Sequence, residues 1–514
     1  MTVQQQVRGP LSAAVARLCT ELRPRLGADA AAGVDEVLER LTAPLQLAVV
    51  GRVASGKSTL VNALIGRNVA PTDVGECTRV VTRFRYGTVD RIEVVLLDGT
   101  THTLPFTQRA GVPADLGVDR RRVSHVEVYL TNAVLRDLTV IDTPGLGSLD
   151  ESSVARAEAV LGAADGTPTT GERLDPVSRR AVLGAEAVLY VLTQSARADD
   201  RHALDTFGAA TGERPAGPAN AVGVLNKADT VEPDSAGDGQ EDPWSSAEAL
   251  AAEQARLLTP KVTDVVPLIA LLAETAESPE FTDADATALH QLARLDPATR
   301  QTMLLSGDLF TEWECAVPAD TRERLLRLLD LYGIRCALEE IDADPTVTAG
   351  RLREALRRRS GLPALRARVN SVFRGRADGI KAAAGLASLA AVARCRAGER
   401  ERRMLHDGIE ALLTQPQAHQ LRLLEALTTV SSGEVELPAD LLDEVLRLGS
   451  SEDFAERLGM PGAPAERMRE FALERARWWR SFASLGSTPA QSRVAHVVHR
   501  AYFLIWRQLR GTSG

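Results

Sequence analysis

A glycine-rich segment near residue 50 carries the residue types and the spacing that bind phosphate. The segment Gly51-Arg-Val-Ala-Ser-Gly-Lys57-Ser58 fits G-x-x-x-x-G-K-[ST], and it lies between the β-rich run 45–50 and the helical run 59–66. Glycines let backbone N–H groups curl around phosphate oxygens, and the following helix presents its positive end. We expect Lys57 to reach the β- and γ-phosphates and Ser58 to ligate Mg²⁺. The predicted nucleotide contacts in this segment are Gly51, Ser55, Gly56, Lys57, Ser58 and Thr59.

A second segment has the chemistry to recognise a guanine base. Asn226-Lys227-Ala-Asp229 follows the apolar run 221–225 and matches N-K-x-D. The Asp229 carboxylate can accept hydrogen bonds from both N1–H and the exocyclic amine of guanine, a pair that adenine does not offer, and each bond to a charged group contributes about 1.5–3 kcal/mol. Asn226 would brace the loop, and the stem of Lys227 would cover the base. Alone this tetrapeptide could be an ordinary turn, but downstream of the phosphate-binding segment it predicts specificity for GTP.

Two further segments predict the metal site. Asp142-Thr-Pro-Gly145 ends the β-rich run 138–142 and matches D-x-P-G, in which the aspartate holds Mg²⁺ through water and the Gly145 N–H senses the γ-phosphate. The alternative is an ordinary turn. The Thr78 hydroxyl is the natural further Mg²⁺ ligand, with its carbonyl holding the attacking water, and Thr82 is the competing choice. We therefore predict a Mg²⁺-dependent GTPase with Lys57, Ser58 and Thr78 as catalytic residues and with Ser58, Thr78 and, through water, Asp142 at the metal.

The elements that must position these motifs form a wound α/β arrangement. Strands separated by helices are expected at 45–50, 79–84, 91–97, 125–130, 138–142, 187–193, 221–226 and 265–271. Leucine and alanine recur at helical spacing in the lead-in 11–41 and throughout the chain after residue 278. A stripe near the carboxyl end is expected to pack against the lead-in helices, and it consists of Val494, Val497, Val498, Ala501, Leu504 and Ile505.

The composition argues against several other classes of protein. The 514 residues carry a formal charge of −9, which disfavours binding to nucleic acid through bulk charge. Five cysteines without a Cys-x-x-Cys pair indicate reduced, cytosolic thiols, and the amino terminus has no secretion signal. The longest mildly apolar run, 382–393, is well short of the roughly 20 residues that a membrane-spanning helix needs. Any membrane contact is therefore expected to be peripheral.

The motif segments together resemble the dynamin superfamily. The resemblance rests on GRVASGKSTLVNAL, PTDVGECTRVVTRF, DTPGL, NKAD and VVPLIALLAETA. Within the superfamily, the chain is most similar to the isoniazid-inducible dynamin-like proteins of actinobacteria. That likeness extends into the helical half through LLDLYGIRCALEEI and RRSGLPALRARV.

The resemblance implies an α/β P-loop GTPase domain, with a mixed and mostly parallel sheet and helices on both faces, joined to an all-α neck and a helical-bundle stalk. The expected divisions are neck helices at 1–44, the GTPase (G) domain at 45–278 and a helical region at 279–514, whose carboxyl-terminal helix 490–510 returns to the neck. It also implies that GTP-bound G domains pair, with a second copy or with a paralogous dynamin-like protein. GTP hydrolysis to GDP would then remodel an anionic membrane surface, from a cytoplasmic position at the inner face of the plasma membrane.

The chain departs from the pattern of the superfamily at two positions. Val53 stands where many dynamins carry a polar residue that helps to orient water. We therefore expect either slow turnover or placement of the water by backbone groups or by a partner domain. Ile269 stands where a serine is common, which leaves the N–H of Ala270 to meet the base oxygen. We expect guanine specificity to survive, because Asp229 supplies the main discrimination.

Two features leave the membrane contact open. Arginines are densest between residues 351 and 376, and they could bind an anionic leaflet or could pair with the many acidic residues. Trp478, Trp479, Phe503 and Trp506 could enter a membrane interface or could pack in a core. Two rival functions also remain: a regulatory switch GTPase with no membrane role, and a weakly hydrolysing subunit of a hetero-oligomeric dynamin-like pair.

Overall fold

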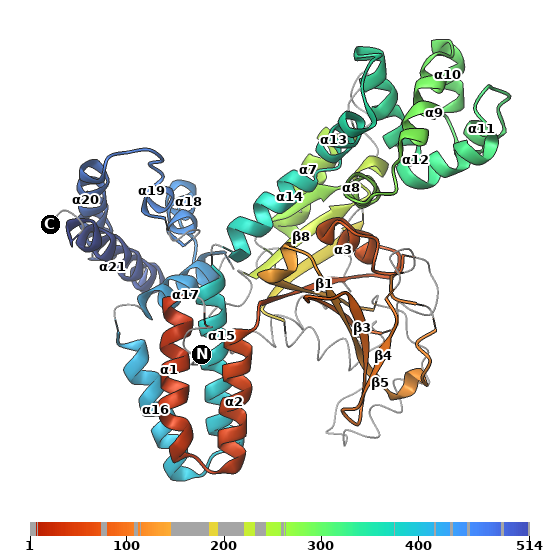
Figure 1. The fold of residues 1–514 in the computed structure, drawn as a ribbon. Helices are drawn as coiled ribbons and strands as arrows, with labels where there is room; N and C mark the ends of the chain where they lie inside the picture. The colour runs from red at the N-terminus through yellow and green to blue at the C-terminus, as the bar shows by residue number, and fades with distance from the viewer. Residues whose placement is uncertain are drawn as a thin grey trace, which may run out of the picture.

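The computed structural model places an α/β domain beside a helical neck and a carboxyl-terminal helical bundle, with a further helical lobe on the α/β domain (Figure 1). The amino terminus lies at the neck, and the carboxyl terminus lies at the far end of the bundle. The structure describes residues 7, 9–72, 80–106, 111–113, 115–144, 185–193, 220–231, 243–258, 262, 264–374, 376–415, 418–431, 435–449, 453–484 and 488–511.

A mixed sheet forms the centre of the α/β domain. Its strands are β1 (Leu45–Gly51), β2 (Thr82–Tyr86), β3 (Arg91–Leu96), β4 (Thr101–Leu104), β5 (Val123–Leu130), β6 (Leu138–Asp142), β7 (Ala187–Thr193), β8 (Ala221–Asn226) and β9 (Val265–Leu268). In the described residues these nine strands lie in the order β4-β3-β5-β2-β6-β1-β7-β8-β9. The strands from β6 to β9 are parallel to one another, and β2 runs antiparallel to β6. Buried strands of this parallel part are continuous apolar runs, as expected for a sheet covered on both faces.

The strand register brings the three sequence motifs to one edge of the sheet. Val49 of β1 pairs with Asp142 of β6, and Thr193 of β7 pairs with Asn226 of β8. Because β1, β6, β7 and β8 are parallel, their carboxyl ends meet at the same edge. In open α/β sheets, ligands bind outside this edge where neighbouring connections diverge.

Helices cover both faces of the sheet. The apolar residues of α3 (Lys57–Ile65), α8 (Ala270–Glu277) and α14 (Leu362–Val369) pack into one core with one face. On the other face, Ala251 and Leu258 of α7 (Pro243–Leu258) pack against β-strand residues. The predicted fold class, a mixed and mostly parallel sheet with helices on both faces followed by a helical region, is confirmed. The strand expected at 265–271 ends earlier, at Leu268, because Ala270 begins α8.

The outer lobe, which follows the boundary expected at residue 278, packs on the α/β domain. Its helices share a core with α8 and with Ala228, and they are α9 (Asp283–Ala293), α10 (Pro297–Met303), α11 (Gly307–Glu312), α12 (Ala319–Ala343) and α13 (Ala349–Arg359). The chain then returns to the sheet, where Leu362, Leu365 and Phe373 complete the sheet core. The apolar core of the sheet therefore includes residues as far along the chain as Ile380, because residues from α14 onward bury apolar side chains against the sheet. Helical periodicity alone does not identify that partner.

A four-helix neck joins both ends of the G domain. It consists of α1 (Pro10–Leu22), α2 (Ala28–Thr42), α15 (Ala377–Cys395) and α16 (Glu399–Leu413), which share one core. The Asp378 carboxylate accepts hydrogen bonds from the N–H groups of Leu11 and Ser12 at 2.8 Å, at the start of α1. The apolar run 382–393 lies inside α15, and its apolar character is explained by burial in this core. Among the described helices, none has the length and apolarity to cross a membrane.

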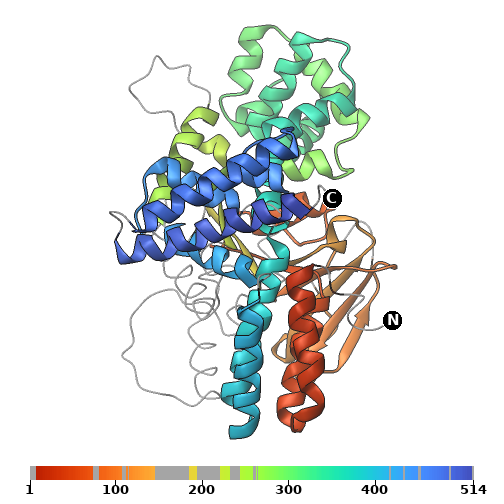
Figure 2. The same ribbon diagram turned by 90° about the vertical axis from the view of Figure 1, so that its left-hand side faces the viewer.

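The carboxyl-terminal helices form a separate bundle. They are α17 (His419–Ser431), α18 (Ala439–Leu448), α19 (Phe454–Leu458), α20 (Ala465–Ser484) and α21 (Pro489–Gly511). Figure 2 shows α20 and α21 lying side by side across the molecule, above the neck. The apolar stripe of α21 packs against α17 and α20 in this bundle, and not against α1 and α2 as we expected. Trp479 and Tyr502 provide the large buried side chains that hold it there.

The arginine-rich stretch 351–376 is bound largely within the protein. Arg366 contacts Glu277 at 2.7 Å, and Arg368 contacts Asp264 at 3.2 Å. Arg376 is buried and donates to the carbonyl of Gly449. Further arginines bind Glu354, Glu339 and the carbonyls at the end of α8. Of the two interpretations of this stretch, the structure favours internal pairing over membrane contact.

Candidate nucleotide-binding site

The phosphate-binding loop is a tight turn between β1 and α3 in which two glycines are sterically required. A Cβ atom on Gly51 would lie 2.3 Å from the carbonyl oxygen of Val191. Gly56 has φ +87°, and a Cβ there would lie 2.2 Å from the Asn226 side-chain nitrogen. Side chains at these positions would displace neighbouring strands, so the loop geometry demands the glycines of the motif.

Lys57 is folded into this loop. Its Nζ donates a hydrogen bond to the carbonyl of Arg52 at 2.7 Å, and the residue is 7% exposed. Burial lowers the pKa of Lys57 to about 8, against the opposing effect of the Asp142 carboxylate. A charged phosphate oxygen accepts a stronger hydrogen bond from an ammonium than a neutral carbonyl does. The Lys57 ammonium is therefore placed to exchange the Arg52 carbonyl for a triphosphate oxygen.

Ser58 and Asp142 form the pair that fits a metal ion. The Ser58 hydroxyl donates to Asp142 Oδ2 at 2.8 Å. Burial raises the pKa of Asp142 to about 6, against the opposing effects of Lys57 and Ser58. In the described part of the chain, Asp142 Oδ1 and Ser55 Oγ are buried without a hydrogen-bond partner. Hard oxygen ligands of this kind, close to a phosphate site, are those that Mg²⁺ prefers.

Asn226 connects three parts of the site. Its Nδ2 donates to the carbonyl of Ser55 in the phosphate-binding loop at 2.7 Å, and its Oδ1 accepts the N–H of Ala270 at 2.9 Å. The bracing role expected for Asn226 thus has a geometric basis. The Ala270 N–H is buried and donates to Asn226 in this structure, so its contact with the base oxygen stays a prediction. The cause of this donation is the start of α8 at Ala270, whose first-turn N–H groups lack acceptors within the helix.

In the N-K-x-D segment, Lys227 is exposed and Asp229 is half-buried. Lys227 adopts a left-handed conformation with φ +58°, which turns the chain after β8. Burial raises the pKa of Asp229, and the negative charge of Asp330 raises it further. Asp330 lies at a kink inside α12, with φ 52° and ψ 177°, and sequence reasoning missed it because nothing in LLRLLDLYGI marks the kink. The outer lobe therefore places the carboxylate of Asp330 near that of Asp229.

Two predicted residues lie outside the described residues, so the roles of Thr78 and Gly145 stay predictions. Thr82, the competing choice for the switch threonine, is buried in β2 opposite Asp142. Its hydroxyl donates to the carbonyl of Val80 at 3.5 Å.

Asn62 is a further residue of the site that motif reasoning missed. From α3, its Oδ1 accepts the N–H groups of Val69 and Ala70 at 2.9 and 2.7 Å. Its Nδ2 donates to the buried Glu274 of α8 at 2.7 Å. Asn62 thereby holds the chain segment that leads from α3 toward Thr78. The available signal was a polar residue within the apolar helical run TLVNALIG.

Glu274 makes a testable contribution to the pH dependence of stability. Burial raises its pKa to about 7 from an ordinary value of 4.5. Between these values the unfolded chain releases a proton that the folded protein keeps, so the free energy of unfolding falls by about 1.4 kcal/mol per pH unit and levels off above pH 7. Glu274→Gln keeps an acceptor for Asn62 and should raise the free energy of unfolding at pH 8 by about 3 kcal/mol, with no gain near pH 4.5.

Thermal unfolding of the two proteins at several pH values measures this effect. The matched control is Glu253→Gln, because Glu253 is an exposed carboxylate on α7 and is not among the groups that raise the pKa of Glu274. A Glu274→Gln protein that is no more stable than the parent at pH 8 would contradict the assignment.

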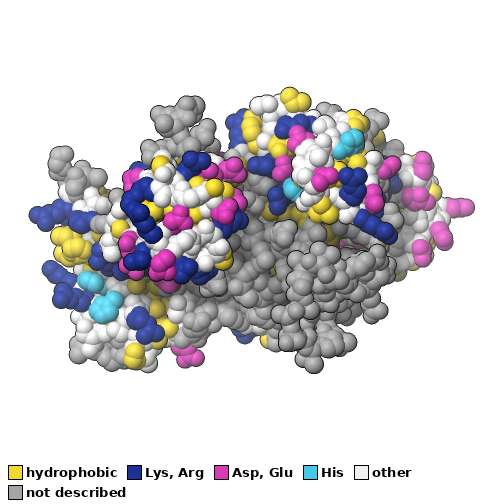
Figure 3. Space-filling model, turned by 90° about the horizontal axis from the view of Figure 1, so that it is seen from below, with side chains coloured by type: hydrophobic (Ala, Val, Ile, Leu, Met, Phe, Trp, Pro, Cys, Tyr) yellow, Lys and Arg dark blue, Asp and Glu magenta, His cyan; other side chains and the backbone are white. Residues whose placement is uncertain are grey.

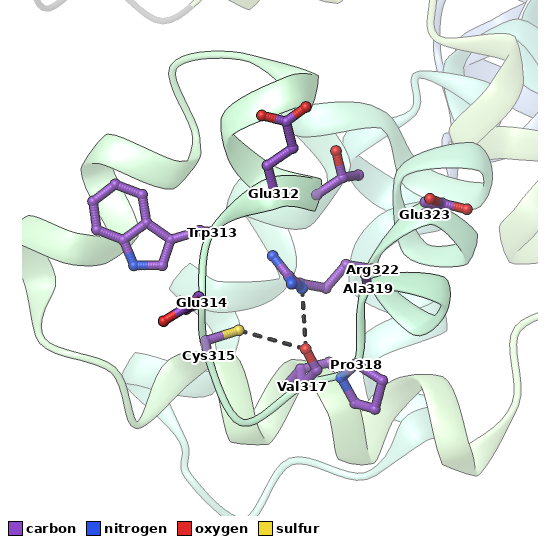
Figure 4. Close-up of a pocket in the computed structure, with 10 residues that line it drawn as sticks. Glu312, Trp313, Glu314, Cys315, Val317, Pro318, Ala319, Arg322 and Glu323 are labelled. Carbon is purple, nitrogen blue, oxygen red and sulfur yellow. Dashed lines mark hydrogen bonds between the residues drawn. The ribbon is translucent and has the colours of Figure 1, made fainter.

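A hollow on the outer lobe has a structural explanation (Figure 4). It lies at the turn between α11 and α12, which Figure 1 places at the end of the lobe away from β1 and α3. The buried Arg322 donates to the carbonyls of Val317 and Phe310, and the Cys315 thiol also contacts the Val317 carbonyl. These contacts close the turn. Because the turn lies away from β1 and α3, the hollow is separate from the nucleotide site.

Comparison with known proteins agrees with this geometry. The Dynamin family model matches residues 47–227, which span β1 to the start of the N-K-x-D segment. The isoniazid-induced protein IniC of Mycobacterium tuberculosis is 31% identical over 494 residues, which are 94% of this chain and 94% of IniC. The bacterial dynamin-like protein of Nostoc punctiforme is 33% identical over 182 residues, 30% of this chain and 26% of that protein.

Among solved structures, a bacterial dynamin pair described as sensing and tethering membranes matches 97% of this chain and 75% of its own, with 12% identity and a TM-score of 0.33. The resemblance seen in the motifs is confirmed by the family model and by the near-complete overlap with IniC. The chain belongs to the dynamin family, and its α/β domain is a dynamin-type GTPase domain.

Proposed function

We propose that this GTPase binds GTP with Mg²⁺, hydrolyses it to GDP, and uses the change to move its neck against an anionic membrane surface. The observation that carries the nucleotide part is the convergence of the phosphate-binding loop, Asp142 and Asn226 at one sheet edge. Membership of the dynamin family supports the membrane part. The expected place of action is the inner face of the plasma membrane.

Each residue of the site has a proposed role. Lys57 binds the β- and γ-phosphates, while backbone N–H groups from Gly51 to Thr59 surround the phosphate oxygens. Ser58, Thr78 and, through water, Asp142 hold Mg²⁺, which neutralises charge that develops during phosphoryl transfer. Thr78 positions the attacking water and the Gly145 N–H binds the γ-phosphate. Asp229 recognises guanine, braced by Asn226 and covered by Lys227, and the Ala270 N–H meets the base oxygen.

Short connections between the G domain and the neck support the coupling. α2 ends at Thr42 and β1 begins at Leu45, so a shift of the sheet reaches the neck through two residues. At this junction, the Lys381 ammonium of α15 donates to the carbonyl of Ala43. On the other side, a π-helical turn at Asn370–Arg374 precedes α15, and such turns are frequent at functional sites. Movement at the nucleotide site thus has two short routes into one helical unit.

Pairing of G domains is proposed to complete the catalytic site. Val53 is 46% exposed on the phosphate-binding loop, and its side chain cannot orient water by hydrogen bonding. A second G domain, from another copy or from a paralogue, would orient the attacking water at this exposed loop. The basal rate of an isolated G domain is therefore expected to be low.

The test is GTP turnover per molecule over a range of protein concentrations, with and without anionic liposomes. We expect the rate per molecule to rise with concentration and to rise again with liposomes, since pairing and membrane crowding both bring G domains together. A flat rate that ignores lipid would favour a switch GTPase without a membrane role. A rate at background throughout would favour a weakly hydrolysing subunit of a hetero-oligomer.

A further inference from the structure

A basic and aromatic stripe runs along the outer face of α21. Its members are spaced alternately by three and four residues, which places them on one helix face. All six are exposed, and we call them the α21 stripe: Arg493, His496, Arg500, Phe503, Arg507 and Arg510. The end of the molecule formed by α20 and α21 shows basic, histidine and hydrophobic side chains together (Figure 3).

The orientation of this stripe is held by the opposite face of the helix. Val498, Ala501 and Ile505 are buried in the carboxyl-terminal bundle. The buried Glu444 of α18 accepts hydrogen bonds from Tyr502 of α21 and from Trp479 of α20, at 2.5 and 2.9 Å. This network joins three helices, so α21 cannot rotate to hide the stripe without breaking buried hydrogen bonds.

The charge of the stripe is not balanced within the described protein. α21 contains four arginines and no Asp or Glu, although the chain as a whole carries a charge of −9. In the part of the chain that the structure describes, the ion pairs of arginine include none with Arg493, Arg500 or Arg507. The arginines of 351–376 differ, since most of them bind carboxylates or carbonyls. Within the described residues, α21 therefore carries a run of positive charge that no acidic residue of its own helix balances.

An apolar group interrupts the basic stripe at its centre. Phe503 is 40% exposed, and its ring centroid lies 5.4 Å from that of Trp506, over which Arg510 is placed. Arginine with exposed aromatic rings is the composition of helices that lie in the headgroup region of a bilayer, where cations bind anionic lipid and rings enter the acyl boundary. The stripe covers 18 residues of helix, about 26 Å in length, which suits a flat surface.

We propose that α21 docks along its stripe on an anionic lipid bilayer, with Arg493, Arg500 and Arg507 binding headgroups and Phe503 entering the interface. This inference rests on the proposed membrane function and names the surface that performs it. A nucleic acid would also attract the arginines, but it gives no reason for a phenylalanine exposed at the centre of the stripe. The bilayer accounts for both features.

The experiment is co-sedimentation of the full chain with vesicles of phosphatidylcholine alone or mixed with phosphatidylglycerol. Arg500→Glu/Arg507→Glu should lower binding to the anionic vesicles at least about 30-fold, because each arginine near such a surface contributes about a factor of five. Phe503→Ser should weaken binding less and leave its salt dependence in place. The charge-matched control is Arg400→Glu/Arg403→Glu on α16, which should bind as the parent does.

Parallel measurements separate the possible results. Circular dichroism and basal GTP turnover check that each variant is folded, since the stripe residues lie away from the nucleotide site. If the α21 variants bind anionic vesicles as well as the parent does, or if only the α16 control loses binding, the proposal is overturned. Either result remains compatible with the proposed membrane function. Absence of parent binding to any anionic vesicle overturns both. Binding of the parent to a double-stranded DNA probe more tightly than to vesicles, with loss in the α21 variants, assigns the stripe to nucleic acid and also overturns the proposal.

Discussion

Lys57→Ala is expected to lower GTP turnover about 10²–10³-fold, which is the range for removing one preorganised electrostatic contact to a developing charge. Lys57 is the described cation of the phosphate-binding loop that is buried against a loop carbonyl, 2.7 Å from the Arg52 oxygen. Its loss leaves the phosphate charge to backbone N–H groups and to the proposed Mg²⁺ ion. The effect should appear at every protein concentration, because pairing of G domains cannot replace a group inside the loop.

Single-turnover hydrolysis with saturating protein separates this chemical effect from weaker binding. The folded state should persist in Lys57→Ala, since burial disfavours the charged form of Lys57 and its ammonium donates to a loop carbonyl. Thermal unfolding without nucleotide checks this point. Turnover within about threefold of the parent would show that Lys57 does not serve the reaction, since loss of a loop contact costs far more.

Asp229→Asn is expected to change the preferred base from guanine to xanthine. The carboxylate accepts from two guanine donors, whereas an asparagine amide offers one acceptor and one donor. Xanthine presents N1–H and a C2 carbonyl, which match that pair. Because two hydrogen bonds to a charged group are affected, GTP affinity should fall about 10²–10⁴-fold while the affinity for XTP rises.

Competition of GTP and XTP against a fluorescent guanine nucleotide measures the preference. The matched control is Asp330→Asn, which makes the same change in the neighbouring carboxylate at the α12 kink. This control should keep the preference for GTP, because Asp330 influences Asp229 through charge. If Asp229→Asn retains tight GTP binding and rejects XTP, the base is recognised by a different group.

The local motifs predict the chemistry of the site from the sequence alone, because each is a short run of adjacent residues. The glycines, Lys57 and Ser58 stand at a strand-to-helix turn, and Asp142 and Asn226 stand at strand ends. Parallel strands bring their carboxyl ends to one edge, so these motifs could be assigned to one site before the structure was known. The α/β class and the helical second half followed from periodicity in the same way.

Only the tertiary structure decided which surfaces meet. The spacing of apolar residues in a helix predicts that one face is buried, but it does not identify the partner of that face. The buried apolar face of α21 was expected to pack on the neck, and it packs on α17 and α20. The same ambiguity affects the G-domain boundary expected at residue 278, since residues as far as Ile380 contribute to the core of the sheet. Hydrogen bonds across the chain were equally hidden, as for Ala270, whose N–H is engaged by Asn226. The pairing of arginines was also not evident from the sequence. Arginines of 351–376 form ion pairs in the folded protein, whereas those of α21 are exposed. Packing, and not spacing along the chain, decides which distant residues lie close together.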